Sequence, residues 1–257
     1  MNAEKALALL GSLPGHVGFY YRDTVTGTEI AFHASDPVDA ASVIKLPVMA
    51  EAFRQREAGL LSFDEKVTIR REDKMPSCGA LTYMRDGLTV TLGDLVTLMI
   101  ILSDNTAANL LIRRLGIESV NATAAALGCG EGTMLRRPLF RPDLSALGIR
   151  NTVSARDMGL FLGRLLEGTN VSAEASEEML GILKNQRLNG KMPFYLKPRG
   201  ILCAHKTGED DAVTHDVGII YAATPRIFCF LSEGTDVPMA ERALQDLALM
   251  AALDDQR

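Results

Sequence analysis

The chain contains no tryptophan and only four cysteines and four histidines in 257 residues. The cysteines form neither a CxxC pair nor a dense cluster, so the sequence predicts neither a zinc site nor a disulfide framework. The histidines are scattered, with no pair at the spacing of metal ligands on a helix. We therefore expect no metal ion, no other cofactor, and free thiols at Cys78, Cys129, Cys203 and Cys229.

The sequence also lacks an excess of positive charge and a long apolar run. A net charge of −5 gives no electrostatic reason to expect nucleic acid or an anionic membrane as a partner. The longest apolar stretches, such as residues 95–102, fall far short of the roughly 20 residues that span a bilayer. The first ten residues, with Glu4 among them, predict an amphipathic helix and not a secretory signal. The sequence as written predicts a cytoplasmic protein, or a secreted or periplasmic one if a signal has been removed.

The composition, with 47% hydrophobic and 23% charged residues, is that of one large globular domain or two intimate ones. Period-two patterns predict strands near both ends of the chain, over 16–22, 27–33, 201–206, 214–222 and 226–231. Helical patterns predict helices over 3–12, 42–57, 91–102, 106–115, 117–127, from 154, 172–186 and 238–253, with irregular structure over 61–90 and a loop over 130–152.

This order of elements predicts an α/β (α+β) fold. We expect an antiparallel sheet of about five strands, built from both termini and flanked by helices, with an inserted all-helical subdomain. The sheet subdomain would comprise residues 1–36 and 194–257, and the helical subdomain residues 37–193. We expect the active site at their interface.

Ser42 and Lys45 open one of the predicted helices in the stretch Ala41-Ser42-Val43-Ile44-Lys45. Three residues of helix turn through roughly 300°, so the two side chains lie on one face about one turn apart. A hydroxyl beside an amine is the minimum for a serine nucleophile with a lysine base, and burial would lower the pKa of the amine so that it could accept the proton. Taken alone, the pattern more simply indicates a helix N-cap with a surface lysine.

Two further short motifs can each be explained by a purely structural role. Ser103-Asp104-Asn105 lies between two predicted helices, where these residue types cap helix ends. Lys206-Thr207-Gly208 lies at the predicted end of a strand, where a turn glycine is common. Taken alone, each motif favours this structural role.

Together and in this order, the three motifs are those of the penicillin-recognising serine enzymes. The stretch Ser103-Asp104-Asn105-Thr106-Ala107-Ala108-Asn109-Leu110-Leu111 resembles the corresponding stretch of class A β-lactamases nearly residue for residue. The separations between the motifs are also close to those of that family. The chain is therefore identified as a member, from a divergent branch, with the β-lactamase/transpeptidase-like fold as the expectation.

The resemblance implies the roles of a nucleophile and its proton carriers. Ser42 would attack the lactam carbonyl and form an acyl-enzyme. Lys45 would accept its proton directly or through water, a step whose base is disputed in this family. Ser103, held near Lys206, would pass a proton to the departing nitrogen. Asp104 would be a buried structural acceptor.

The resemblance also implies a set of substrate-binding residues. Asn105 would bind the side-chain amide of the substrate, and Lys206 with Thr207 would bind its carboxylate. Gly208 would let the substrate lie against the strand because no side chain obstructs it. The backbone N–H groups of Ser42 and Glu209 would form the oxyanion hole.

The sequence departs from the family at the residue that deacylates the enzyme. Class A enzymes carry a glutamate in the loop before the helix at Ser154, with an asparagine four residues later. Counting from Ser103 places that glutamate near Leu139, and no Glu-x-x-x-Asn occurs in the loop. Asp143 is the only carboxylate between Glu131 and Asp157, and it is either a deacylating base or, more simply, a partner for a loop arginine.

The residues after the third motif differ as well, with His215-Asp216 close to the predicted site. Such a pair is either a structural hydrogen bond or a second functional group.

We thus expect a serine hydrolase that opens β-lactam amides through Ser42, with slow deacylation as one option. The alternatives are a penicillin-binding-like peptidase or esterase and an acylatable sensor domain. The partner would be a small molecule, with no nucleic acid and no membrane, and the protein a monomer.

Overall fold

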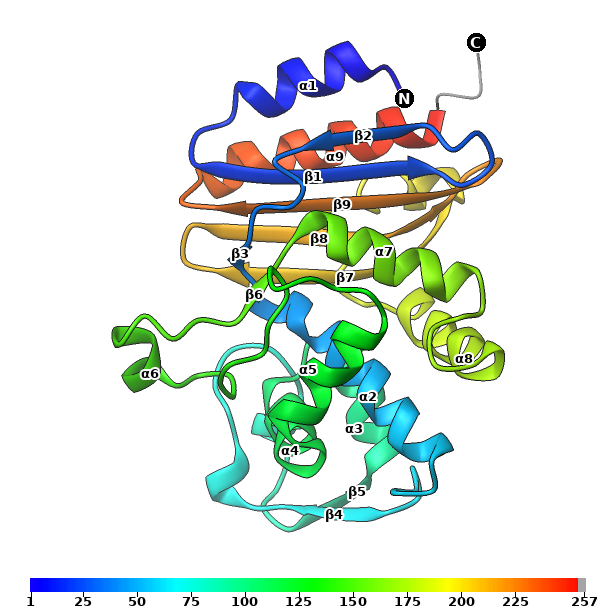
Figure 1. The fold of residues 1–257 in the computed structure, drawn as a ribbon. Coiled ribbons are helices and arrows are strands. Elements are labelled where there is room, and N and C mark those ends of the chain that lie inside the picture. The colour runs from blue at the N-terminus through cyan, green and yellow to red at the C-terminus, as the bar shows by residue number, and fades with distance from the viewer. Residues whose placement is uncertain (254–257) are drawn as a thin grey trace.

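The computed structural model describes residues 1–253, drawn in Figure 1. Its α-helices are α1 Ala3–Gly11, α2 Lys45–Glu57, α3 Leu92–Ile101, α4 Asn105–Leu115, α5 Ile117–Ala126, α6 Pro142–Ala146, α7 Ala155–Leu166, α8 Ala173–Lys184 and α9 Val237–Leu253. Its strands are β1 His16–Asp23, β2 Glu29–Phe32, β3 Val38–Asp39, β4 Lys66–Ile69, β5 Leu88–Thr91, β6 Thr152–Val153, β7 Leu202–Asp210, β8 Val213–Tyr221 and β9 Pro225–Glu233. Short 3₁₀ turns are η1 Ala41–Ile44, η2 Arg71–Asp73, η3 Leu81–Tyr83 and η4 Lys197–Arg199.

A five-stranded antiparallel sheet in the order β2-β1-β9-β8-β7 joins the two ends of the chain. The central pairing sets His16 of β1 opposite Glu233 of β9. The predicted mixed α/β fold with a sheet of about five strands built from both termini is therefore confirmed.

Alternation along β1 explains why the sheet is covered on both faces. Phe19 and Tyr21 belong to an apolar cluster with α1 and α9, whereas Tyr20 belongs to the larger cluster that includes α7. The Tyr20 ring lies so close to α7 that a Cβ on Gly159 would stand 2.2 Å from it. Only glycine at that position lets α7 approach the sheet.

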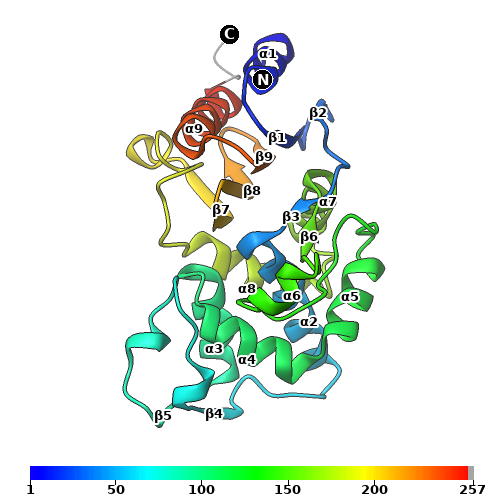
Figure 2. The same cartoon turned by 90° about the vertical axis from the view of Figure 1, so that its left-hand side faces the viewer.

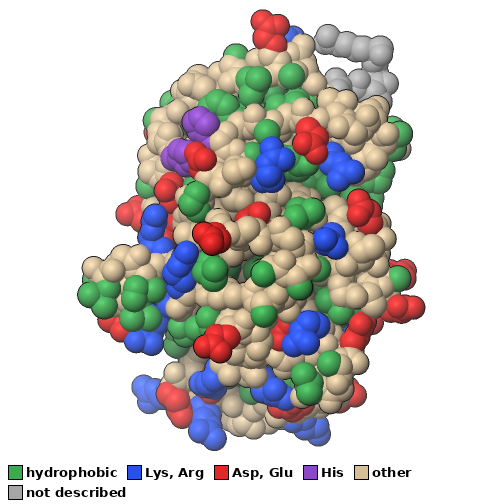
Figure 3. Space-filling view, in the orientation of Figure 1, with side chains coloured by type: hydrophobic (Ala, Val, Ile, Leu, Met, Phe, Trp, Pro, Cys, Tyr) green, Lys and Arg blue, Asp and Glu red, His purple; other side chains and the backbone are tan. Residues whose placement is uncertain are grey.

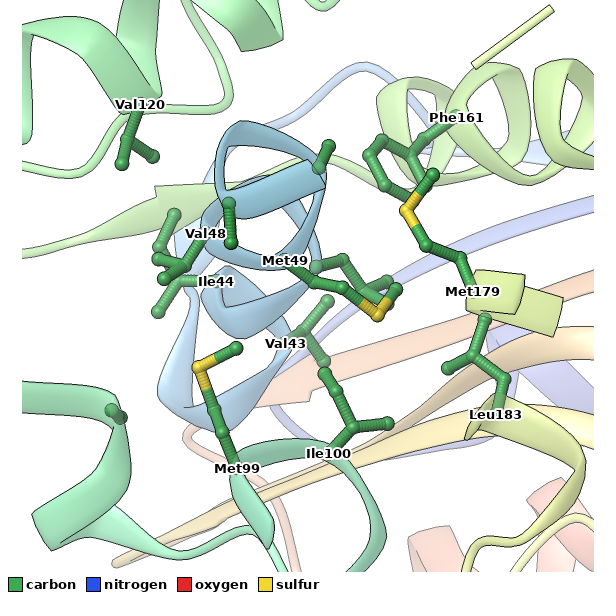
Figure 4. Packing of buried hydrophobic residues seen from close by; sticks show 14 of the residues in the cluster. Val43, Ile44, Val48, Met49, Met99, Ile100, Val120, Phe161, Met179 and Leu183 are labelled. Carbon is green, nitrogen blue, oxygen red and sulfur yellow. The ribbon is translucent and has the colours of Figure 1, made fainter. Parts of the chain in front are cut away.

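Helix α2 directly follows the turn η1, and it is buried on nearly every side. Figure 4 shows Val48 and Met49 of α2 among side chains from α3, α5, α7 and α8. Full burial of each such side chain contributes roughly 1.5–3 kcal/mol. The residues at the start of α2 are thereby held in fixed positions.

Turned by 90°, the molecule shows β7 as the sheet strand nearest to η1 and α2 (Figure 2). The predicted division into residues 1–36 with 194–257 and residues 37–193 stays a prediction. Helix α7 bears on it, because it packs on β1 and β9 although it belongs to the central part of the chain. Within residues 1–253, no helix combines the length and apolar character needed to cross a membrane.

Three local expectations are wrong. Residues 61–90 contain the antiparallel pair of β4 and β5, whose four-residue length is too short for a period to stand out. The segment 130–152 is not all loop, since α6 forms within it and β6 begins at Thr152. The strand of the third motif runs on to Asp210 instead of ending near Lys206, because the charges at its end face solvent along a continuing strand.

Candidate active site

Ser42 lies in the 3₁₀ turn η1 and is not the N-cap of an α-helix, as its sequence position suggested. The α-helix starts at Lys45, and no side chain caps it. Ala41, just before the serine, has a φ of +39°, a left-handed conformation that is uncommon for a residue with a side chain. The turn nevertheless keeps the expected proximity, with Lys45 Nζ 2.9 Å from Ser42 Oγ.

Lys45 is completely buried, and its contacts fit a neutral amine. Its Nζ lies 2.7 Å from Ser103 O and 2.7 Å from Asn105 Oδ1, two oxygens that can only accept hydrogen bonds. A neutral amine donates its two N–H groups to these oxygens and keeps its lone pair for one of two hydroxyls, that of Ser42 at 2.9 Å or that of Ser103 at 3.1 Å. Burial, together with the nearby Lys206 ammonium, lowers the pKa of Lys45 well below its usual value.

Ser103 stands at the corner between α3 and α4, with a φ of +54°. Its Oγ lies 3.1 Å from Lys45 Nζ and 3.0 Å from Lys206 Nζ, so one hydroxyl joins two lysines. Asp104 N-caps α4 by accepting the N–H of Ala107. Its other oxygen accepts the N–H groups of residues 80 and 81, which is the arrangement of a buried structural acceptor.

Lys206 and Thr207 lie inside β7 and are almost completely buried. Lys206 Nζ donates to Ser103 Oγ and, at 2.7 Å, to Thr207 O. Burial lowers the pKa of Lys206 to about 7, although the Asp216 carboxylate partly offsets it. The cation that would hold a substrate carboxylate is therefore present below about pH 7 and is lost above it.

Gly208 is required for a reason that differs from the expected one. A Cβ at this position would stand 2.8 Å from Cδ2 of His215 and 3.2 Å from Cγ2 of Val43. The missing side chain thus makes room for packing between β7, β8 and η1. Nothing in this geometry concerns a substrate, so substrate contact at Gly208 stays a prediction.

Glu209 follows on β7, the outer strand of the sheet. Its side chain is largely exposed and pairs with the buried Lys191, whose Nζ lies 3.2 Å from Glu209 Oε1 and 2.9 Å from Gly208 O. Because β7 has a neighbouring strand on one side only, backbone N–H groups at its other edge remain for a ligand.

His215 and Asp216 do not form a pair, because neighbouring strand residues point to opposite faces. Asp216 instead bonds His205, with Oδ1 2.8 Å from Nδ1. His215 Nδ1 accepts the N–H of Ser232 at 3.0 Å, so its Nε2 carries the proton and donates to Asp39 O at 2.7 Å. Burial lowers the pKa of His215 to about 4. Its lone pair is occupied, which excludes it as a general base here.

Ser42 opens into a cavity of about 270 Å³ between η1, the end of β7 and the loop before α7. Leu139 lines this cavity, and the Asn109 side chain fixes its backbone through two hydrogen bonds, of 2.8 Å from Leu139 N and 3.0 Å to Leu139 O. A leucine therefore lines the cavity where the sequence count placed the family's glutamate.

Asp143 is 58% exposed and lies outside the lining of this cavity. Arg141 holds its two carboxylate oxygens at 2.8 and 2.5 Å and lowers the pKa of Asp143 to about 2. Of the two interpretations of Asp143, the geometry fits that of a partner for a loop arginine. Apolar side chains gather on the protruding segment around α6 (Figure 3), where Phe140 and Leu147 are exposed.

The comparisons with known proteins agree with this geometry. Residues 2–253 match the model of the β-lactamase enzyme family. The solved structure of a β-lactamase from Sphaerobacter thermophilus is 31% identical over 98% of this chain and 96% of that one, with a TM-score of 0.89. The chain belongs to the β-lactamase enzyme family. It is a serine β-lactamase-like hydrolase, as predicted.

Two further similar structures are of PBP-A. One is 25% identical over 99% of this chain and 95% of that one, with a TM-score of 0.88. The other, a leucine-to-glutamate variant of PBP-A described as an acyl-enzyme complex with penicillin G, is 24% identical over 99% of this chain and 96% of that one, with a TM-score of 0.88. At that identity, the second likeness shows the fold alone.

The sequence interpretation missed several residues of this β-lactamase-like site. Asn109 lies four residues after Asn105 on α4, so helical spacing could have pointed to it. Cys78, a half-buried free thiol, and Asp39 line the cavity, but neither belongs to a sequence motif. All four cysteines are free thiols, as predicted.

Among residues 1–253, one group of side chains could hold a metal ion. Candidate ligand atoms of His16, His33 and Asp36 lie within 4.8 Å of one another near the ends of β1 and β2. The two imidazole rings are stacked, with centroids 5.2 Å apart, so they would have to rotate before one ion could lie in both ring planes.

Proposed function

We propose that this hydrolase opens β-lactam amides through an ester on Ser42 and hydrolyses that ester slowly. The observation that carries the proposal is the unbroken hydrogen-bond chain from Ser42 through Lys45 and Ser103 to Lys206. It would supply a nucleophile, a neutral base and a proton path.

In the acylation step, Ser42 Oγ attacks the lactam carbonyl carbon while Lys45 Nζ takes its proton. Ser103 Oγ, within hydrogen-bond distance of both lysines, passes a proton to the nitrogen as the C–N bond breaks. The N–H groups of Ser42 and Glu209 would stabilise the oxyanion, and each such donor is typically worth about 3–4 kcal/mol.

Substrate binding uses the remaining residues. Lys206 and Thr207 would bind the carboxylate of the substrate, and Asn105 would bind its amide. Asn105 Nδ2 donates one hydrogen bond to Pro76 O, at 3.2 Å, and a second N–H remains for the substrate. The partner is thus a small β-lactam or a related amide or ester.

Slow deacylation follows from Leu139. General-base assistance is typically worth 10²–10⁴-fold, and a leucine side chain has no group that accepts a proton. The ester would therefore persist longer than in an enzyme with a glutamate at this position.

The test is intact mass measured over time with penicillin G and a cephalosporin. We expect an adduct on Ser42 that forms quickly and decays slowly. Ser42→Ala should form no adduct, and hydrolysis of a chromogenic cephalosporin by that variant would refute the nucleophile. Rapid return to the free mass would mean an efficient lactamase, and no adduct at all would favour a peptidase or esterase with another substrate.

A further inference from the structure

Three carboxylates line the cavity of Ser42 among the residues that the structure describes: Asp39, Glu209 and Asp210. Glu209 is 57% exposed and paired with Lys191. Asp210 is exposed at the end of β7, where one of its oxygens accepts the N–H of the next residue. Asp39 differs from both, because it is half-buried and precedes Ser42 by three residues.

The two oxygens of the Asp39 carboxylate have different surroundings. Oδ1 accepts the N–H of Ala41 at 3.0 Å and so fixes the turn that presents Ser42. Within residues 1–253, Oδ2 has no hydrogen-bond partner, and Asp39 lines the cavity. One oxygen therefore holds the backbone, while the other has no partner among residues 1–253 and belongs to a residue that lines the same cavity as Ser42.

The backbone of Asp39 is held from three sides. Its N–H donates to the Glu233 carboxylate at 2.8 Å, and its carbonyl accepts from His215 Nε2. Asp39 also pairs with Thr152 in the two-stranded sheet of β3 and β6. The carboxylate is thus attached to fixed backbone, which a base needs if it is to position water.

Burial leaves Asp39 a stronger base than an ordinary aspartate, although the hydrogen bond from Ala41 N–H opposes this. Burial raises the pKa of Asp39. The cations of Arg150 and Arg137 oppose this increase, and the Asp210 carboxylate adds to it. His215 faces it as a neutral imidazole, and Glu233 binds its backbone N–H. Proton acceptance becomes more effective as the pKa of the base approaches the working pH.

We propose that Asp39 is the general base that activates water to hydrolyse the Ser42 ester, a function that Leu139 cannot supply. This inference rests on the proposed function. Water gives a proton to Asp39 Oδ2, and its oxygen bonds to the acyl carbon. The bond from that carbon to Ser42 Oγ then breaks and the proton returns to Oγ, so that one water is added across the ester.

Asp39→Asn separates the two roles of this residue, because the amide oxygen still accepts the N–H of Ala41 but is not basic. Intact mass over time with penicillin G measures acylation and deacylation separately. We expect unchanged acylation and an adduct lifetime at least roughly 10²-fold longer. Asp210→Asn is the matched control from the same cavity: it removes only a charge that adds to the pKa of Asp39, so its adduct lifetime should change far less than that of Asp39→Asn.

The pH profile distinguishes a base from a structural residue. Wild-type deacylation should increase as pH rises through the pKa of Asp39 and then level off, whereas Asp39→Asn should show no such step. Formate should shorten the adduct lifetime in Asp39→Ala. Equal lifetimes in wild type and Asp39→Asn, or slowed acylation in that variant, would overturn the proposal. If the wild type forms no adduct, the proposed function itself fails, which is a different result.

Discussion

His215 offers the sharpest test of the hydrogen-bond arrangement behind the nucleophile. It is fully buried, accepts from Ser232 N and donates to Asp39 O, so it joins β9 to the segment that carries Ser42. Protonation would place a second N–H against the N–H of Ser232. Burial first, and the Lys191 cation in addition, therefore hold the pKa of His215 at about 4, below the usual 6.5.

The sign and size of the pH effect follow from this shift. Above pH 6.5, His215 is neutral in both the folded and the unfolded chain, and its favourable contacts contribute fully. Between pH 6.5 and about 4, the unfolded chain binds the proton first, so the fold loses stability as pH falls. At about 1.4 kcal/mol per pH unit, the interval from 6.5 to about 4 amounts to about 3 kcal/mol.

The assay is urea denaturation of the wild type and His215→Gln at pH 7.5, 5.5 and 4. Glutamine keeps an N–H for Asp39 O, and it cannot titrate. We expect the variant to be less stable by about 1–3 kcal/mol at pH 7.5, since Ser232 N loses its acceptor. On going to pH 4, the wild type should lose about 3 kcal/mol more than the variant. Parallel pH curves would refute the neutral, buried histidine.

Three further outcomes are expected at the cavity itself. Leu139→Glu should shorten the adduct lifetime by roughly 10²–10⁴-fold in timed mass spectra, because it places a carboxylate where Asn109 fixes the backbone. Asp143→Asn should leave that lifetime unchanged, since Arg141 occupies the carboxylate outside the cavity, and accumulation of adduct would show the opposite. The acylation efficiency for penicillin G should fall above about pH 7 as Lys206 loses its charge, whereas a neutral ester without a carboxylate should show no such decline.

The sequence predicted the parts of this molecule that have a strong local pattern. Apolar alternation marked the five sheet strands, and the pattern of three motifs pointed to the family, which the comparisons confirm. The hydroxyl–amine pair of Ser42 and Lys45 does come together, although a 3₁₀ turn and not an α-helix places it.

The rest could not be predicted because it depends on contacts between distant segments. Asp39 has no motif, and only the approach of η1 and the loop before α7 makes it part of a cavity. The partner of Asp216 is His205 on the neighbouring strand, which depends on the register of β7 and β8 and not on chain order. The need for glycine at position 208 comes from the His215 side chain on the neighbouring strand, and this contact cannot be read from the sequence of one strand.

The register of β1 with β9 has a consequence for how the protein is made. His16 meets its opposite residue, Glu233, only after nearly the whole polypeptide has left the ribosome. Pairings between such remote segments form slowly, and an incomplete chain exposes the unpaired edge of β1 meanwhile. A nascent chain that stops before β7 lacks Lys206, the residue proposed to bind the substrate carboxylate.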